Sequence, residues 1–126
     1  MYSSIVLEHF RAPYHRGRCA GSHLAGQSGE PGAGPYMMMS LVIHEEVVVE
    51  AWFETYNCPS AIACGSWLAR WLEGKTCQFA AVVDACDIDR MVGGLPPGKE
   101  HCPELAVRCL RDALKQWNDS LGGIPA

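Results

Sequence analysis

The sequence predicts a single α+β domain in which helices cover one face of a small antiparallel sheet of about three strands. Residues 36–43 and 47–56 alternate apolar and polar side chains, and only His44-Glu45-Glu46 separates them. This pattern is typical of an antiparallel hairpin with one apolar face. The stretches before and after it carry apolar residues at helical spacing instead. The order helix, strands, helices indicates α+β architecture.

The chain before the hairpin predicts one helix, one weak strand and a loop. A helix is expected over Tyr2–Arg11, ended by Pro13. Arg18–Gly26 is weakly patterned and is expected to supply at most a short edge strand. Gln27–Pro35 is rich in glycine and proline, so it is expected to form a loop.

The two hairpin strands each have a predicted core face. In the first strand this face comprises Met37, Met39, Leu41 and Ile43. In the second it comprises Val47, Val49, Ala51 and Phe53. Such alternation suits a sheet that is covered on one side only.

Four helices are predicted after the hairpin. The first begins at Pro59 and is stopped by Gly74, and short helices follow over Thr76–Val83 and Asp87–Gly93. The last runs from Pro103 to about Asn118. Its apolar stripe comprises Ala106, Cys109, Leu110, Ala113, Leu114 and Trp117.

Length and composition predict one soluble domain over residues 1–126, with a flexible tail over 119–126. The chain is 48% hydrophobic and 19% charged, as globular proteins are. A net charge of -4 argues against binding to a nucleic-acid backbone. No apolar run is long enough to cross a bilayer, and the amino terminus lacks a signal-peptide layout, so a cytoplasmic location is expected.

Seven cysteines are many for this length, and their odd number argues against a disulfide framework. Metal binding, thiol chemistry and plain burial remain as explanations, and burial is expected for most of them. Cys64 and Cys109 lie on apolar helix stripes and are expected in the core, whereas Cys77 and Cys86 are expected to pack against it.

Two cysteines precede prolines at predicted helix starts. Proline favours the first helical position, which makes Cys102 and Cys58 the expected N-caps of their helices. A thiol at the positive end of a helix dipole has a lowered pKa. A single such cysteine is most often a structural choice. Two of them, with His101 beside Cys102, predict a three-ligand site for zinc or iron if both helices start at the same end of the sheet.

The motifs of the chain resemble one known family over nearly its whole length. Residues 2–17 resemble the opening of the NifU/IscU-type iron–sulfur cluster scaffolds, and Cys58-Pro59-Ser60-Ala61-Ile62-Ala63 resembles that family's Cys-Gly-Ser-Ala-Ile-Ala segment. Glu73-Gly74-Lys75-Thr76 matches its Gly-Lys-Thr turn. Leu95-Pro96-Pro97-Gly98-Lys99-Glu100-His101-Cys102 resembles its Leu-Pro-Pro-Val-Lys-Leu-His-Cys stretch.

The resemblance implies a non-enzymatic protein that receives iron and sulfur and assembles a [2Fe-2S] cluster. The implied partners are a cysteine desulfurase, apo iron–sulfur proteins, and a heat-shock-type chaperone. By position, Cys58, His101 and Cys102 are the implied ligands. The implied chaperone-binding segment comprises Leu95, Pro96, Pro97 and Lys99, with Gly98 standing where the family has valine.

One departure from the family lies in the loop before the hairpin. The family has Cys-Gly-Asp there, whereas this chain has Ala33-Gly34-Pro35, so a ligand cysteine and an aspartate are missing. Clusters normally take four protein ligands. Glu30, Cys64 or Cys19, or a partner protein, would have to supply the fourth, and the spacing selects none of them.

Two main hypotheses of function therefore follow. The first is a scaffold that assembles a cluster with three ligands or a borrowed fourth. The second is a degenerate family member that binds zinc or a single iron, or only another protein, without cluster assembly. A third is a persulfide acceptor in which Cys102 takes sulfur from the desulfurase.

Overall fold

A computed structural model describes residues 2–17, 24–30, 32, 34–55 and 59–122, without the side chains of 119–122. Its helices and strands follow the predicted order. The elements are α1 (Ser4–Arg11), β1 (Leu24–Ser28), β2 (Met37–His44), β3 (Val47–Thr55), α2 (Pro59–Leu72), α3 (Cys77–Ala80), α4 (Ala85–Met91) and α5 (His101–Gly122). No helix in these ranges is both long and apolar enough to span a membrane.

The three strands form one antiparallel sheet in the order β1-β2-β3, as predicted. Pairing places Gly26 opposite Met39, and Met39 opposite Phe53, so these three residues form a row across the sheet. Residues in one row point to the same face. Met39 and Phe53 are fully buried, so this is the core face.

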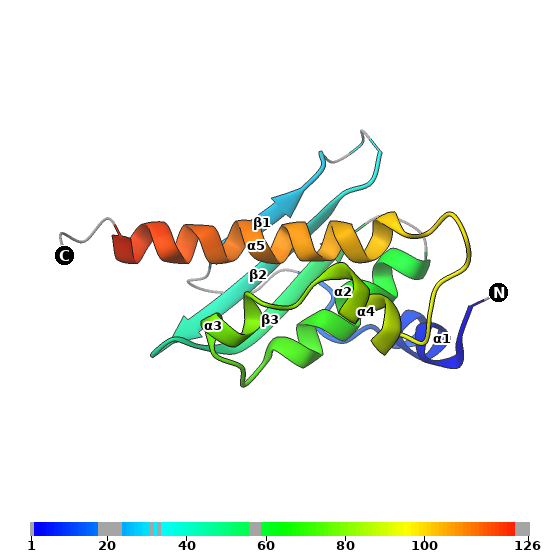
Figure 1. The fold of residues 1–126 in the computed structure, drawn as a ribbon, viewed down its shortest axis with the longest axis horizontal. Coiled ribbons are helices and arrows are strands. Elements are labelled where there is room, and N and C mark those ends of the chain that lie inside the picture. Colours follow the sequence, from blue (N-terminus) through cyan, green and yellow to red (C-terminus); the bar gives the residue numbers. More distant parts are fainter. Residues whose placement is uncertain (1, 18–23, 31, 33, 56–58, 123–126) are drawn as a thin grey trace.

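Two helices cover this core face side by side (Figure 1). A Cβ at Gly26 would lie 2.1 Å from the carbonyl oxygen of Cys109, which shows how closely α5 approaches β1. A Cβ at Gly65 would lie 2.4 Å from the ring of Phe53, so α2 packs equally closely on β3. Because both contacts involve the same row of the sheet, α2 and α5 lie on the same face.

Both helices also begin at the same end of the sheet. Ser28, Met37 and Thr55 pair across this end, where β1 ends, β2 begins and β3 ends. The chain enters α2 at Pro59, shortly after Thr55. The start of α5 borders a hollow that Ser28 also lines. The sheet therefore positions both predicted cysteine-proline helix starts at one edge of the domain.

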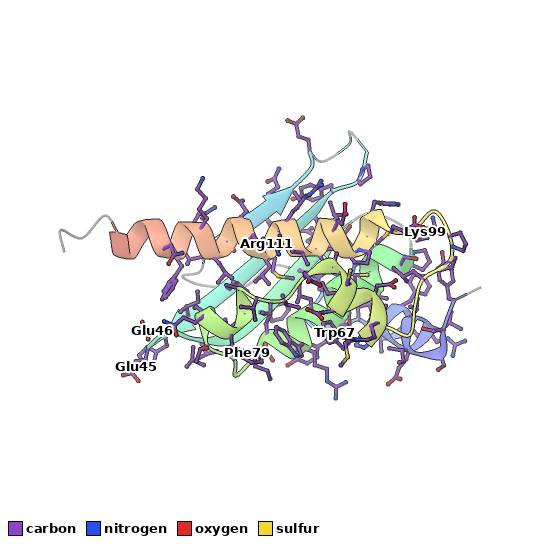
Figure 2. All side chains as sticks on the ribbon, viewed as in Figure 1. Glu45, Glu46, Trp67, Phe79, Lys99 and Arg111 are labelled. Atoms are coloured by element: carbon purple, nitrogen blue, oxygen red, sulfur yellow. The ribbon has the colours of Figure 1, made fainter. Side chains whose placement is uncertain are left out.

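The β2–β3 hairpin turns at the opposite end of the sheet, far from Lys99 of the loop before α5 (Figure 2). Glu45 and Glu46 both have positive φ, 50° and 66°, which is typical of a two-residue type I′ turn. The prediction of a hairpin is confirmed, but its loop is one residue shorter than expected because His44 belongs to β2.

The predicted core face of β3 is wrong in its first half. Pairing shifts between Val42 and Ile43, where a bulge adds a residue on the β3 side. As a result Val48 is fully buried and Val49 is 50% exposed, the reverse of the alternation expected from the sequence. Ala51 and Phe53 are buried as predicted.

The bulge makes a matched pair of substitutions informative. We expect Val48→Thr to lower the free energy of unfolding by about 1–2 kcal/mol, because it buries a hydroxyl at a position built for an apolar side chain. Val49→Thr is expected to change it by less than about 0.5 kcal/mol. Urea unfolding of both variants measures the difference, and equal effects would show that the bulge is not where the structure places it.

The first helix ends at Arg11 as predicted but begins at Ser4 instead of Tyr2, and β1 also differs from its prediction. The N-cap of α1 is Ser3, whose side chain accepts from the N–H of Val6. β1 continues through Gln27 and Ser28, which were expected in the loop; residues 18–23 lie outside the described part of the chain. Asp112 of α5 explains the extension, since its carboxylate accepts from the N–H of Gln27 at 2.9 Å.

The later helices match in number and differ in their ends. α3 is shorter than predicted and is capped by Thr76. α4 begins at Ala85 because Asp84 and Asp87 form a capping box. α5 continues to Gly122 instead of ending near Asn118. The flexibility of 119–126 stays a prediction, and 123–126 lie outside the described residues.

Candidate metal centre

A tight turn leads into α5. Proline at its second position and Gly98 at its third, with φ of 90°, are the features of a type II turn. The N–H of Lys99 donates to the carbonyl of Pro96 at 3.2 Å and closes it. Valine adopts such a φ only with strain, so Gly98 gives this segment a turn that the family's valine disfavours. Pro97 and Gly98 are exposed, whereas Leu95 packs partly against the core.

The helix begins two residues earlier than predicted. α5 starts at His101, so Cys102 is its second residue and not its N-cap. Pro103 is tolerated there because the first turn of a helix has no use for its missing N–H. The carboxylate of Glu100 accepts hydrogen bonds from its own N–H and that of Gly98, and these lower its pKa. Cys102 stays within the first turn, where the positive end of the helix dipole acts.

His101 and Cys102 present two metal-binding atoms at one point. His101 Nε2 and Cys102 Sγ lie 3.5 Å apart. Tetrahedral geometry with zinc bonds of about 2.3 Å to sulfur and 2.0–2.1 Å to nitrogen gives a separation of about 3.6 Å between the two ligand atoms. The pair therefore has the spacing of two ligands of one tetrahedral ion. His101 is exposed, while Cys102 is fully buried.

The third predicted ligand, Cys58, lies outside the described residues. Ser60, two positions later in the first turn of α2, is described. Its hydroxyl is fully buried and has no hydrogen-bond partner among the residues that the structure describes. Such a hydroxyl fits a site that receives a sulfur atom or a metal-bound ligand able to accept a hydrogen bond. Among the described residues alone, no three histidine, cysteine or acidic side chains are grouped closely enough to hold a metal.

The loop before β2 reaches the same site from the other side. A hollow of about 270 Å³ is lined by Ser28, Gly29 and Pro35 on the sheet side and by His101, Glu104 and Arg108 on α5. Pro35, which by the resemblance to the family replaces an aspartate, therefore lines the same hollow as His101. Ala33 is outside the described residues.

Two of the three predicted replacement ligands are described, and they occupy different environments. Cys64 is fully buried in α2 and belongs to the hydrophobic core, as its position on the helix stripe predicted. Glu30 is exposed on the loop after β1. Neither belongs to a described group of metal-binding side chains, so their role as ligands stays a prediction. Cys19 lies outside the described residues.

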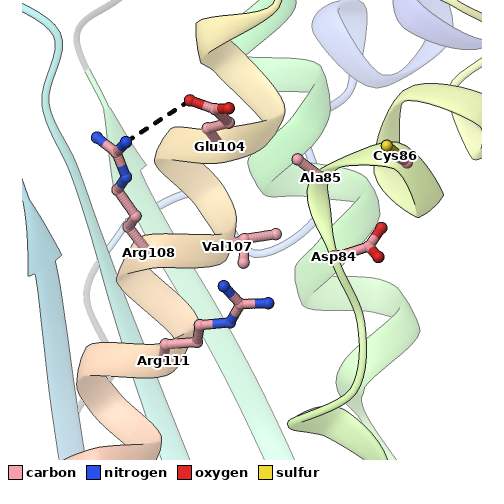
Figure 3. A pocket seen from close by; sticks show the side chains of 7 residues that line it. All are labelled: Asp84, Ala85, Cys86, Glu104, Val107, Arg108 and Arg111. Atoms are coloured by element: carbon pink, nitrogen blue, oxygen red, sulfur yellow. Dashed lines mark ion pairs between the residues drawn. The ribbon is translucent and has the colours of Figure 1, made fainter.

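Among Cys64, Cys77, Cys86 and Cys109, only Cys86 is exposed, so the expectation that it packs against the core is wrong. It lies near the start of α4, beside a hollow between α4 and α5 (Figure 3). Cys109 is buried as predicted, donates to the carbonyl of Met37 at 2.7 Å, and burial raises its pKa to about 12.

This difference predicts selective labelling. Thiolates, not thiols, react with iodoacetamide, and both exposure and pKa control the rate. At pH 8 we expect Cys86 to be labelled in minutes while Cys109 stays unmodified until the protein is unfolded. Peptide mass spectrometry measures both sites in one sample. Comparable labelling of the two residues in folded protein would contradict their assigned positions.

Two other histidines have structural partners that sequence patterns did not reveal. His9 Nδ1 lies 2.7 Å from the hydroxyl of the buried Ser66, and burial lowers the pKa of His9. His15 stacks against Trp52 and lies 3.0 Å from a carboxylate oxygen of Glu73. These contacts join residues far apart in sequence, so periodicity carries no signal for them. The contact of His9 fixes α1 against α2, and the contacts of His15 fix the segment after α1 against the sheet.

Comparisons with known proteins identify the family of this chain. Residues 1–121 match the model of the NifU-like N-terminal domain. The chain belongs to the NifU-like N-terminal domain family. It is 36% identical over 118 residues to the iron–sulfur cluster assembly scaffold protein IscU of Aquifex aeolicus, an alignment that covers 92% of this chain and 75% of that protein. It is 30% identical over 125 residues to IscU of Azotobacter vinelandii, with 96% and 97% covered.

A solved structure shows the same fold. The N-terminal part of a NifU-like protein from Brucella abortus superimposes with a TM-score of 0.71 at 18% identity, covering 93% of this chain and 94% of that one. The superposition on this NifU-like structure confirms the predicted α+β fold. The relatives named above are scaffold proteins and not enzymes, in agreement with the expected absence of enzymatic activity.

Proposed function

We propose that this protein is an iron–sulfur cluster assembly scaffold that holds its cargo through Cys58, His101 and Cys102. The observation that carries the proposal is the 3.5 Å separation of His101 Nε2 and Cys102 Sγ at the start of α5, in a family whose named relatives are such scaffolds. Histidine and cysteine are suitable ligands for iron in clusters. The cargo is a [2Fe-2S] cluster or iron on its way to one.

Sulfur delivery by a cysteine desulfurase belongs to this proposal. If Cys102 is the acceptor, its thiolate attacks the outer sulfur of the desulfurase persulfide, forms a new S–S bond and releases the desulfurase thiolate, so no external oxidant is needed. Cys102 is fully buried. Transfer to Cys102 therefore requires the side chains that cover its sulfur to move aside, and we expect the desulfurase to bind at this edge of the sheet.

The remaining partners follow from the same role. Apo iron–sulfur proteins would receive the cluster. A heat-shock-type chaperone would bind Leu95, Pro96, Pro97 and Lys99. Of these four residues Pro97 is the exposed one, and it lies in the type II turn. We place this activity in the cytoplasm.

Anaerobic reconstitution tests the proposal. Protein incubated with ferrous iron, cysteine and a cysteine desulfurase is expected to develop the visible absorption of a [2Fe-2S] centre. Omitting the desulfurase is the control. A fully folded product that stays colourless would contradict cluster assembly.

A second candidate function is favoured by Pro35, which faces His101 across the hollow where the family has aspartate. It is a binding module that holds zinc or a single iron through the three ligands without building a cluster. Metal analysis separates the two functions: one zinc per chain without sulfide supports the module, and labile sulfide argues against it.

A further inference from the structure

We infer that Arg16 is a positioning residue for the metal centre: it ties the end of β3 to the segment that follows α1, and so sets how the chain continues toward Cys58. This inference rests on the proposed function, because it assumes that Cys58 binds the cargo. It assigns a role to residues 14–17, none of which is a proposed ligand.

The main chain of residues 15–17 covers the outer edge of β3. The N–H of Phe53 donates to the carbonyl of His15 at 3.1 Å, and the N–H of Gly17 donates to the carbonyl of Phe53 at 2.7 Å. Arg16 and Phe53 form a parallel bridge between these two bonds. An edge strand offers its outward N–H and C=O groups for such pairing. The segment is therefore fixed in one register beside the last residues of β3.

Glu73, directly after α2, holds the start of this segment. Its carboxylate accepts a hydrogen bond from the hydroxyl of Tyr14 and lies 3.0 Å from Nδ1 of His15. It also accepts from the N–H of Ala51 in β3 at 3.1 Å. The ring of His15 stacks between Tyr14 and Trp52, with centroid separations of 4.1 and 4.2 Å. These contacts join the segment to both α2 and β3, so it has a defined position from which a side chain can act.

Arg16 connects this segment to the end of β3. Its guanidinium donates to the carbonyl of Thr55 at 3.2 Å. Thr55 is the last residue of β3 and precedes Cys58 by three positions. The carbonyl that Arg16 binds belongs to the peptide through which the chain leaves the strand. Because a charged donor makes a stronger hydrogen bond than a neutral one, this bond restrains the direction in which the chain continues toward Cys58.

The charge of Arg16 alone predicts the opposite effect on metal binding. A positive side chain repels a bound cation, so removing the charge would by itself tighten metal binding. Removing the bond to Thr55 instead releases the chain before Cys58, which weakens binding. The sign of the change in metal affinity therefore separates positioning from electrostatics.

Zinc titration of three variants tests the inference. We expect Arg16→Ala to raise the Kd for zinc about tenfold, the lower end of the effect of residues that orient metal ligands, while circular dichroism shows an unaltered fold. Arg16→Lys keeps a charged donor for the carbonyl of Thr55, so it is expected to restore the wild-type affinity. Arg11→Ala is the matched control, because it removes the same charge from the exposed end of α1, and it is expected not to raise the Kd.

The possible failures of the inference and of the proposed function differ. Unchanged or tighter zinc binding in Arg16→Ala, or equal weakening in Arg16→Lys, would overturn the inference and leave the proposed function intact. Failure of the wild-type protein to bind zinc, or wild-type affinity in Cys58→Ser, would instead contradict the proposed function.

Discussion

Replacing Cys102 with serine is expected to abolish stoichiometric metal binding, with a Kd for zinc at least about a hundredfold weaker than that of the wild type. Serine keeps the size of the side chain but lacks the thiolate that binds zinc and iron. Cys102 Sγ is one of the two proposed ligand atoms that lie 3.5 Å apart, so its loss leaves only His101 and Cys58 of the proposed set. Isothermal titration with zinc measures the effect.

Cys109→Ser is the matched control, since Cys109 lies on the same helix two turns further on. Its thiol donates to the carbonyl of Met37, a bond that a serine hydroxyl can also make. We expect this variant to bind zinc as the wild type does. If Cys102→Ser retained full occupancy, the assignment of the metal centre to the start of α5 would be wrong.

Gly26→Ala is expected to destabilise the fold by about 3 kcal/mol, the upper part of the range for overpacking. A Cβ at this position would lie 2.1 Å from the carbonyl oxygen of Cys109 and 2.5 Å from the nitrogen of Ala113. Backbone atoms cannot turn aside as a flexible side chain does, so α5 must move away from β1. Urea unfolding measures the loss of stability.

The same substitution is also expected to weaken zinc binding, because α5 carries His101 and Cys102. Ala25→Ser is the control on the neighbouring residue, whose side chain points to the opposite face of β1. Its effect on stability is expected to stay within about 0.5 kcal/mol. Unchanged stability and zinc binding in Gly26→Ala would show that α5 does not rest on β1 as the structure has it.

The sequence predicted most of the fold because its elements carry strong periodic signals. The alternation in Met37–His44 predicted a core face in which Met37, Met39 and Leu41 are buried and Ile43 is partly buried. The stripe of α5 is buried as predicted, except that Trp117 is partly buried. The errors arise where a local irregularity of the backbone shifts the alternation of buried and exposed side chains. The bulge opposite Val42 reverses the burial of Val48 and Val49, and single-strand alternation does not reveal a bulge.

Only those residues of the candidate site that belong to local sequence motifs could be predicted. The cysteine-proline pairs marked the starts of α2 and α5, and the sheet brings these starts to one edge of the domain. By contrast, the hollow that His101 and Pro35 share depends on how α5 meets the loop before β2, a tertiary contact that the spacing of residues does not encode. The exposure of Cys86 depends in the same way on how α4 packs.

The central claim, that the start of α5 carries an iron–sulfur cargo, is tested most directly by elemental analysis with acid-labile sulfide determination. The protein should be purified without oxygen and compared with Cys102→Ser. The account predicts iron and sulfide in equal amounts in the wild type and neither in the variant. Stoichiometric zinc without sulfide in the wild-type protein would contradict it.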